Sequence, residues 1–136
     1  YMKADDKGAI ADLDNAIKLK PTAEAYSQRG LAKYQMKDYN SCIVDESMAL
    51  GLNPNYANAY YNRGLCFFSM TNDDSAIKDF TRAIELNPQS AQAFHYRGLS
   101  KSYKKDKDGA CKDLQKSKEL GYTKSEEELN KLNCGG

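Results

Sequence analysis

The sequence repeats itself four times with a period close to 34 residues. Four fifteen-residue segments align without a gap: KGAIADLDNAIKLKP (7–21), NSCIVDESMALGLNP (40–54), DSAIKDFTRAIELNP (74–88) and DGACKDLQKSKELGY (108–122). Their starts lie 33, 34 and 34 residues apart. Such a period is typical of stacked copies of one small unit, none of which buries its apolar face alone. The pattern therefore predicts an extended surface for binding before it predicts any chemistry.

Each copy is predicted to be a helical hairpin. A motif with an aromatic residue followed by Arg-Gly-Leu precedes the last three segments, at 26–31, 60–65 and 94–99. Within the segments, small and apolar residues recur at helical spacing, as Ala76, Phe80 and Ala83 do. Prolines at positions 21, 54 and 88 stand where a helix ends. Short polar connections between the two motifs indicate tight turns between antiparallel helices.

The chain resembles tetratricopeptide repeat proteins over residues 1 to about 124. The matching residues are Tyr60, Gly64, Phe67, Ala76, Phe80, Ala83 and Pro88 in one unit, Tyr26, Gly30, Cys42, Ala49 and Pro54 in the unit before, and Phe94, Gly98, Ala110 and Leu114 in the unit after. The resemblance implies an all-α fold, a right-handed superhelical solenoid of antiparallel helical hairpins with a C-terminal capping helix. We expect the motif glycines to face the small residues Cys42, Ala76 and Ala110.

We expect a single array over residues 1–136. It divides into a partial repeat at 1–22 that is mainly a second helix, full repeats at 23–56, 57–90 and 91–124, and a capping helix and tail at 125–136. Tyr1 aligns with Tyr34 and Phe68, so the first-helix motif is missing from the first unit, and we interpret the chain as a fragment of a longer protein. The Ser125-x-x-Glu128 pattern predicts a capping box at the last helix.

Charged residues also follow the repeat. Arginines recur at 29, 63 and 97, and aspartates recur at 12, 45, 79 and 113. Because antiparallel helices bring together residues placed symmetrically about a turn, each arginine is expected to bridge the aspartates of its own hairpin and the preceding one. Binding of an anionic ligand is the alternative, which the regular acidic partners disfavour.

Glu46 departs from the pattern, since it stands where Leu13, Phe80 and Leu114 stand in the other copies. A buried glutamate requires a partner. Antiparallel packing places Glu46 near Tyr26, so we expect the Tyr26 hydroxyl to be that partner.

A second stripe on the first helices is the candidate binding surface. The resemblance implies that these helices line a concave groove. The candidate peptide-binding residues are Tyr34, Tyr61, Asn62, Leu65, Phe68, His95 and Leu99, with Gln28, Asn58 and Gln92 among the polar rim. The alternative is that Leu31, Leu65 and Leu99 only pack first helix against first helix.

Some members of the family use this groove as a carboxylate clamp for the acidic C-terminus of a chaperone, which requires Lys, Arg and Asn. The matching positions here are Ser27, Leu31, Asn62, Gln92 and Tyr96. Only Asn62 fits, so we expect no clamp activity.

The four cysteines allow three pairings. Cys42 and Cys66 are symmetric about Pro54, but Cys42 also fills the small-residue position of the repeat, so we interpret it as a core residue. A bond between Cys111 and Cys134 would staple the C-terminal helix in an oxidising compartment.

Other functions find no support in the sequence. Twenty basic and nineteen acidic residues give a formal charge of +1 without a basic cluster, so we expect no nucleic-acid partner and no membrane insertion. His95 is the single histidine and no C-x-x-C spacing exists, so we expect no metal, no cofactor and no enzyme activity.

The predicted function is a non-catalytic protein–protein interaction module that binds a peptide or helix of a partner in the concave groove. The alternative is an assembly or spacer element of a larger multidomain or envelope-associated protein. Such an element acts by domain docking or by self-association through the truncated N-terminal face. The sequence leaves the location open between the cytoplasm and a bacterial periplasm or envelope.

Overall fold

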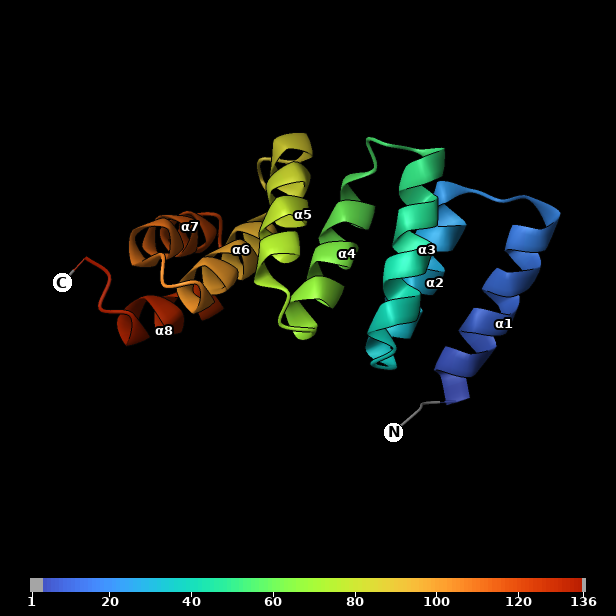
Figure 1. Ribbon diagram of the computed structural model, residues 1–136, viewed down its shortest axis with the longest axis horizontal. Coiled ribbons are helices and arrows are strands. Elements are labelled where there is room, and N and C mark those ends of the chain that lie inside the picture. Colours follow the sequence, from blue (N-terminus) through green and yellow to red (C-terminus); the bar gives the residue numbers. More distant parts are fainter. Residues whose placement is uncertain (1–3, 136) are drawn as a thin grey trace.

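The computed structural model describes residues 4–135, which form an array of α-helices without a strand (Figure 1). The helices are α1 (Ala4–Leu19), α2 (Ala23–Gln35), α3 (Tyr39–Leu52), α4 (Ala57–Ser69), α5 (Asp73–Leu86), α6 (Ala91–Tyr103), α7 (Lys107–Glu119) and α8 (Lys124–Lys131). They follow one another along the long axis of the molecule, so the two ends of the chain lie far apart. The predicted all-α repeat fold is confirmed.

Local sequence sets where most of these helices begin. Thr22, Asp38, Asn72, Ser90 and Asp106 each accept a hydrogen bond from the backbone N–H three residues further on. Such caps satisfy one of the free donors at a helix start. The hairpin turns also share one backbone feature, a non-glycine residue with φ between 59° and 67° at positions 37, 71 and 105. The repeat therefore extends to the backbone of the turns.

The capping box predicted for the last helix is wrong. α8 begins at Lys124, and its N-cap residue Thr123 makes no side-chain cap bond. Ser125 lies inside the first turn, where its hydroxyl lies 2.7 Å from Nδ1 of His95. The hydroxyl is thus engaged by the neighbouring helix α6 and does not cap its own helix.

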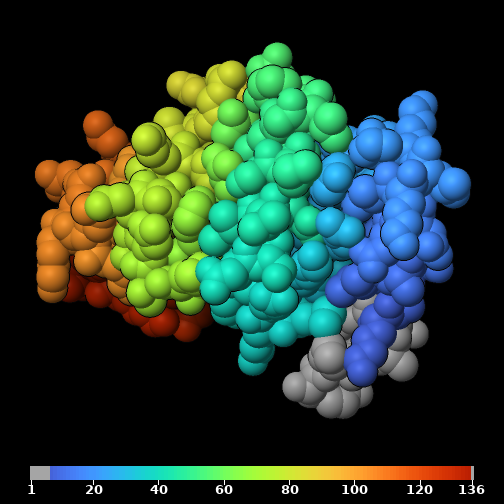
Figure 2. Space-filling view, turned by 45° about the vertical axis from the view of Figure 1, so that its right-hand side comes forward, coloured from blue at the N-terminus to red at the C-terminus, as the bar shows by residue number. Residues whose placement is uncertain are grey.

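The first helices of the hairpins, α2, α4 and α6, line the inner face of the array. Each helix packs mainly on its neighbour in the chain, and α2 also contacts α4, as α4 contacts α6. Successive second helices within the described residues make no comparable contacts. Elements on the inside of a curved stack lie closer together than those outside, so the first helices lie on the concave side. Figure 2 shows the successive segments packed side by side without a break.

The motif glycines face the largest buried side chain of the partner helix. Gly30 faces Glu46, Gly64 faces Phe80 and Gly98 faces Leu114. A Cβ atom added at Gly64 would lie 2.7 Å from the Phe80 ring, so only glycine fits there. The expectation of small residues at these contacts is met at Gly98, where an added Cβ atom would also lie 3.2 Å from the backbone oxygen of Ala110. At the other two crossings it is wrong, because Cys42 and Ala76 lie one helical turn before the residues that the glycines touch.

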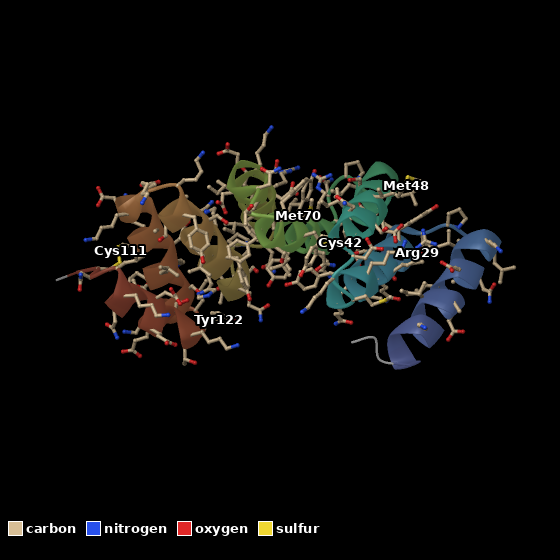
Figure 3. All side chains as sticks on the ribbon, turned by 60° about the horizontal axis from the view of Figure 1, so that its bottom comes forward. Arg29, Cys42, Met48, Met70, Cys111 and Tyr122 are labelled. Carbon is tan, nitrogen blue, oxygen red and sulfur yellow. A yellow bond between two sulfur atoms is a disulfide. The ribbon has the colours of Figure 1, made fainter. Side chains whose placement is uncertain are left out.

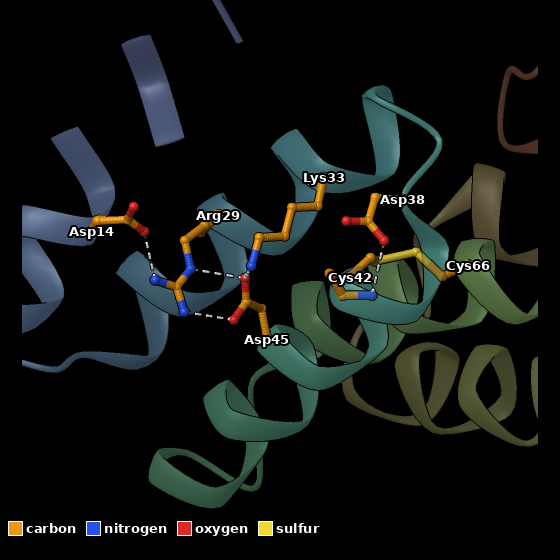
Figure 4. Close-up of polar contacts among 8 residues, drawn as sticks. Asp14, Arg29, Lys33, Asp38, Cys42, Asp45 and Cys66 are labelled. Atoms are coloured by element: carbon orange, nitrogen blue, oxygen red, sulfur yellow. Dashed lines mark hydrogen bonds and ion pairs between the residues drawn. A yellow bond between two sulfur atoms is a disulfide. The ribbon is translucent and has the colours of Figure 1, made fainter. Parts of the chain in front are cut away.

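Arginine–aspartate pairs close each hairpin. Arg29, Arg63 and Arg97 make two hydrogen bonds each to Asp45, Asp79 and Asp113, at 2.7–2.9 Å. Figure 4 shows the first of these pairs, with the Lys33 ammonium 2.9 Å from the same Asp45 carboxylate. Lys101 binds Asp113 in the same way. These lysines therefore replace the aromatic Phe67 of the middle unit with an ion pair.

Each arginine also reaches the preceding repeat, but not at the predicted aspartate. The partners are Asp14 for Arg29, Ser47 for Arg63 and Thr81 for Arg97. Asp45 points into its own hairpin, and a residue two positions later lies about 200° further around the helix. Ser47 therefore faces the next hairpin and Asp45 does not. Because each arginine is engaged on both sides, the structural interpretation of this charge pattern holds.

Two disulfides link second helices to the element that follows. Cys42 of α3 bonds Cys66 of α4, with 6.7 Å between the Cα atoms. Cys111 of α7 bonds Cys134 after α8, with 5.6 Å between the Cα atoms. The interpretation of Cys42 as a simple core residue is incomplete, because it fills the small-residue position and is also bonded. No free cysteine occurs among the described residues.

Loss of the Cys111–Cys134 bond should release α8 from the array. This helix buries only Ser125 and Leu129, and a bond that closes a loop of this length contributes about 3 kcal/mol. For the variant Cys111→Ser/Cys134→Ser we expect faster amide hydrogen exchange in residues 124–131 with α4 and α5 unaffected. Reduction of the wild type should have the same effect on α8. Unchanged protection of α8 in both experiments would contradict this assignment.

Candidate functional site

A pocket of about 470 Å³ opens on the inner face of the array. It is lined by Ser27, Gln28, Leu31, Tyr56, Ala57, Asn58, Tyr61, Asn62, Ala83, Asn87, Ser90 and Gln92. These residues come from α2, from the N-terminal half of α4, from Ala83 of α5, from the start of α6 and from the connections between hairpins. None of the lining side chains carries a formal charge at neutral pH. The pocket combines amide and hydroxyl groups with two tyrosines and one leucine.

Two of the candidate peptide-binding residues, Tyr61 and Asn62, line this pocket. The predicted rim residues Gln28, Asn58 and Gln92 line it too. Sequence reasoning missed the contribution of the connections between hairpins, which supply Tyr56, Asn87 and Ser90. The prediction followed stripes along the helices only. The short, polar connections after Pro54 and Pro88 were the signal that could have pointed to these residues.

The other aromatic and aliphatic candidates lie in the contact between first helices. Leu65 is 7% exposed and forms a buried cluster with Ala76 and Phe80. Tyr34 and Phe68 pack against this cluster and remain partly exposed. Leu99 is half-buried. Phe68 is thus neither sealed in the core nor turned to the outer face, but its ring also packs 5.4 Å from that of Tyr96.

His95 lies between α6 and α8 and not on the open groove. It is 5% exposed, and its ring lies 4.7 Å from that of Tyr122 and next to the Ser125 hydroxyl. Burial lowers the pKa of the His95 imidazole. The capping helix occupies the side of α6 that the stripe pattern assigned to a ligand, so His95 holds α8 in place.

Glu46 is a fully buried carboxyl group beside the pocket. Neither of its oxygens has a hydrogen-bond partner of good geometry among the described residues. Ser27 and Asn62 face the carboxyl and favour its charged form, but burial outweighs them and raises the pKa of Glu46 to about 8. The expected Tyr26 partner is wrong, because the Tyr26 ring packs on the cluster of Ala49, Leu50 and Ala59.

At the interface between the first two full hairpins, beside the pocket, three positions of the repeat are polar. Ser27, Glu46 and Asn62 stand 34 residues before Tyr61, Phe80 and Tyr96. In the following interface these three rings fill the same space, with centroids 5.9–6.5 Å apart. Ser27, Glu46 and Asn62 are themselves buried, so the first interface replaces ring packing with buried polar groups. Comparison of the copies position by position could have found this signal in the sequence.

The described residues contain no group of three or more His, Cys, Asp and Glu side chains placed to hold a metal ion. None of the helices in this part of the chain is both long and apolar enough to cross a membrane.

Replacing Glu46 with Gln should stabilise the fold in a pH-dependent manner. A carboxyl whose pKa rises from 4.5 to about 8 on folding contributes most stability below pH 4.5 and loses it as the pH rises through 8. For Glu46→Gln we therefore expect a gain of roughly 4 kcal/mol at pH 8 that shrinks towards pH 5. Urea unfolding at several pH values measures it. A gain that does not vary with pH would show that the carboxyl titrates normally.

Comparison with known proteins identifies the family. A family model described as tetratricopeptide repeat matches residues 57–90. The chain is similar to the crystal structure of MamA, with 31% sequence identity, a TM-score of 0.80, and coverage of 89% of this chain and 71% of that chain. The chain belongs to the tetratricopeptide repeat family. Among curated protein sequences, none matches it.

Two more distant structures share the fold alone. The first tetratricopeptide domain of RPAP3, bound to the HSP90 peptide SRMEEVD, is 21% identical, with a TM-score of 0.79 over 82% of this chain and 90% of that one. YrrB, described as having an unusual peptide-binding site, is 20% identical, with a TM-score of 0.82 over 92% of this chain and 66% of that one. The family consists of interaction modules that are generally not catalytic.

Proposed function

We propose that the chain is a non-catalytic interaction module that holds a peptide or helix of a partner protein against the inner face of α2, α4 and α6. The observation that carries the proposal is the pocket on this face, whose lining residues come from all three full hairpins. It opens on the face where the first helices meet, and its wall offers hydrogen-bonding groups from Gln28, Asn58 and Gln92 beside the Tyr61 ring.

The chemistry of the pocket suits the backbone of a bound peptide. Side-chain amides both donate and accept hydrogen bonds, so they satisfy the N–H and C=O groups of a segment that leaves water. Tyr61 is half-buried and offers a rigid apolar surface with a polar edge. Peptide binding by the related folds of RPAP3 and YrrB agrees with this assignment.

A matched pair of substitutions on opposite faces tests the proposal. Leu31 lies in the pocket with 36% of its surface exposed, and Val44 lies on the outer side of α3 with 61% exposed. For Leu31→Arg we expect the affinity for the partner to fall at least about tenfold, equivalent to about 1.4 kcal/mol. The reason is that the arginine side chain fills the pocket. Val44→Arg should bind normally. Quantitative capture from native lysate measures both, and circular dichroism checks that both variants fold.

The same pair addresses the second candidate function, assembly. α3 exposes Val44, Met48 and Leu52 in a row, and Figure 3 shows Met48 on this side of the helix. Exposed apolar rows of this kind favour contact with another protein surface. Binding that is lost with Val44→Arg and kept with Leu31→Arg would move the function to the outer face and contradict groove binding.

The acidic peptide SRMEEVD should not bind this chain in the micromolar range. A clamp for a carboxylate needs cationic side chains, and the pocket positions Ser27, Leu31 and Gln92 are neutral. Fluorescence anisotropy with the labelled peptide measures the affinity, and the RPAP3 domain is the positive control. Micromolar binding here would mean that the clamp is built from residues outside this pocket.

A further inference from the structure

The polar interface between the first two full hairpins weakens the fold. At the next interface the equivalent positions bury three aromatic rings against each other. Here they bury a carboxyl group whose oxygens lack good hydrogen bonds. A buried polar group without a partner destabilises a fold. The fold itself gains nothing from Glu46 that explains this cost.

The position of the carboxyl connects it to the pocket. An added Cβ atom on Gly30 would lie 2.5 Å from Oε2 of Glu46, which places the carboxyl against the backbone of α2. Ser27 of α2 and Asn62 of α4 lie beside it, and both of these residues line the pocket. The Asn62 amide donates a hydrogen bond of 3.2 Å to the Ser27 hydroxyl. The two residues that lie beside the carboxyl and line the pocket are thus joined by a side-chain hydrogen bond.

The charges around Glu46 leave it open to a cation. Asp45 on its own helix repels the charged carboxylate, and Arg63 of α4 attracts it. Arg63 is held by Asp79 and Ser47, however, and cannot leave them without breaking its hairpin contacts. The cations of α2, Arg29 and Lys33, are held by Asp45. Among the described residues, no side chain of the chain itself completes an ion pair with Glu46.

We propose that the pocket receives a cationic side chain, Lys or Arg, of the bound peptide, with the Glu46 carboxylate as its counter-ion and Ser27 and Asn62 as further hydrogen-bond acceptors. This inference rests on the groove function proposed above and names its ligand class. Binding breaks the Asn62–Ser27 hydrogen bond and lets the ligand nitrogen reach the carboxylate. A proton leaves Glu46 for the solvent as the cation enters, so binding is linked to pH.

Selection from a random peptide library tests the ligand class. The library is panned against the wild type, Glu46→Gln and the control Glu24→Gln, about one pH unit above the pKa of Glu46. Glu24→Gln removes the same charge from an exposed position of α2. We expect peptides with Lys or Arg at one shared position on the wild type and the control, and no such preference on Glu46→Gln. An enriched peptide should bind Glu46→Gln at least about tenfold more weakly.

The pH dependence is the second readout. The affinity of an enriched peptide for the wild type should rise as the pH increases through about 8, and its affinity for Glu46→Gln should stay flat. This inference would be overturned if the peptides that bind the groove showed no preference for Lys or Arg, or if that preference survived Glu46→Gln. Either result would leave the groove function standing. Failure to enrich any peptide on any of the three proteins would contradict the groove function itself.

Discussion

The contact between a glycine of each first helix and a large side chain of each second helix is the constraint on which the array depends. Phe80 lies directly against the backbone of α4 because Gly64 has no Cβ atom. This close approach brings Arg63 within hydrogen-bonding distance of Asp79, 2.8 Å on both branches. The arginine then reaches Ser47 of the preceding hairpin. The close contact between Gly64 and Phe80 therefore sets the geometry within this hairpin. It also positions the arginine that binds the preceding hairpin.

Helix geometry and spacing were sufficient to predict the hairpins and several specific contacts. The pair Arg63–Asp79 follows from symmetry about a turn, which needs only the rise per residue. The cysteine pairings stayed open, because rise alone does not say whether two side chains face each other. The contacts that failed depend on the direction in which a side chain leaves the helix and on the angle between hairpins. Asp45 does not bind Arg63 because its side chain leaves the helix towards its own hairpin. His95 lies in the contact with the capping helix, which covers α6 there and which the repeat pattern does not encode.

The candidate site was predictable in part for the same reason. Tyr61 and Asn62 were placed in the groove because the resemblance assigns a function to the first helices, and both line the pocket. Leu65 follows the same stripe, yet it is buried between α4 and its neighbours, since a curved stack brings first helices into contact. How far a stripe is covered depends on the curvature of the array. Spacing along one helix carries no information about that curvature.

A repeat array tolerates a poor interface better than a single-core protein does, because each unit contacts only its neighbours. The cost at Glu46 is confined to the junction of two hairpins, and the junction is reinforced by the Cys42–Cys66 bond between α3 and α4. The chain therefore keeps its fold while one interface departs from the aromatic packing of the next. Residues that break the local rule of a fold without compensation are expected where a protein binds or reacts. In this array the rule is broken at Glu46, a buried carboxyl that the fold leaves without a good hydrogen bond, next to Ser27 and Asn62 of the pocket wall.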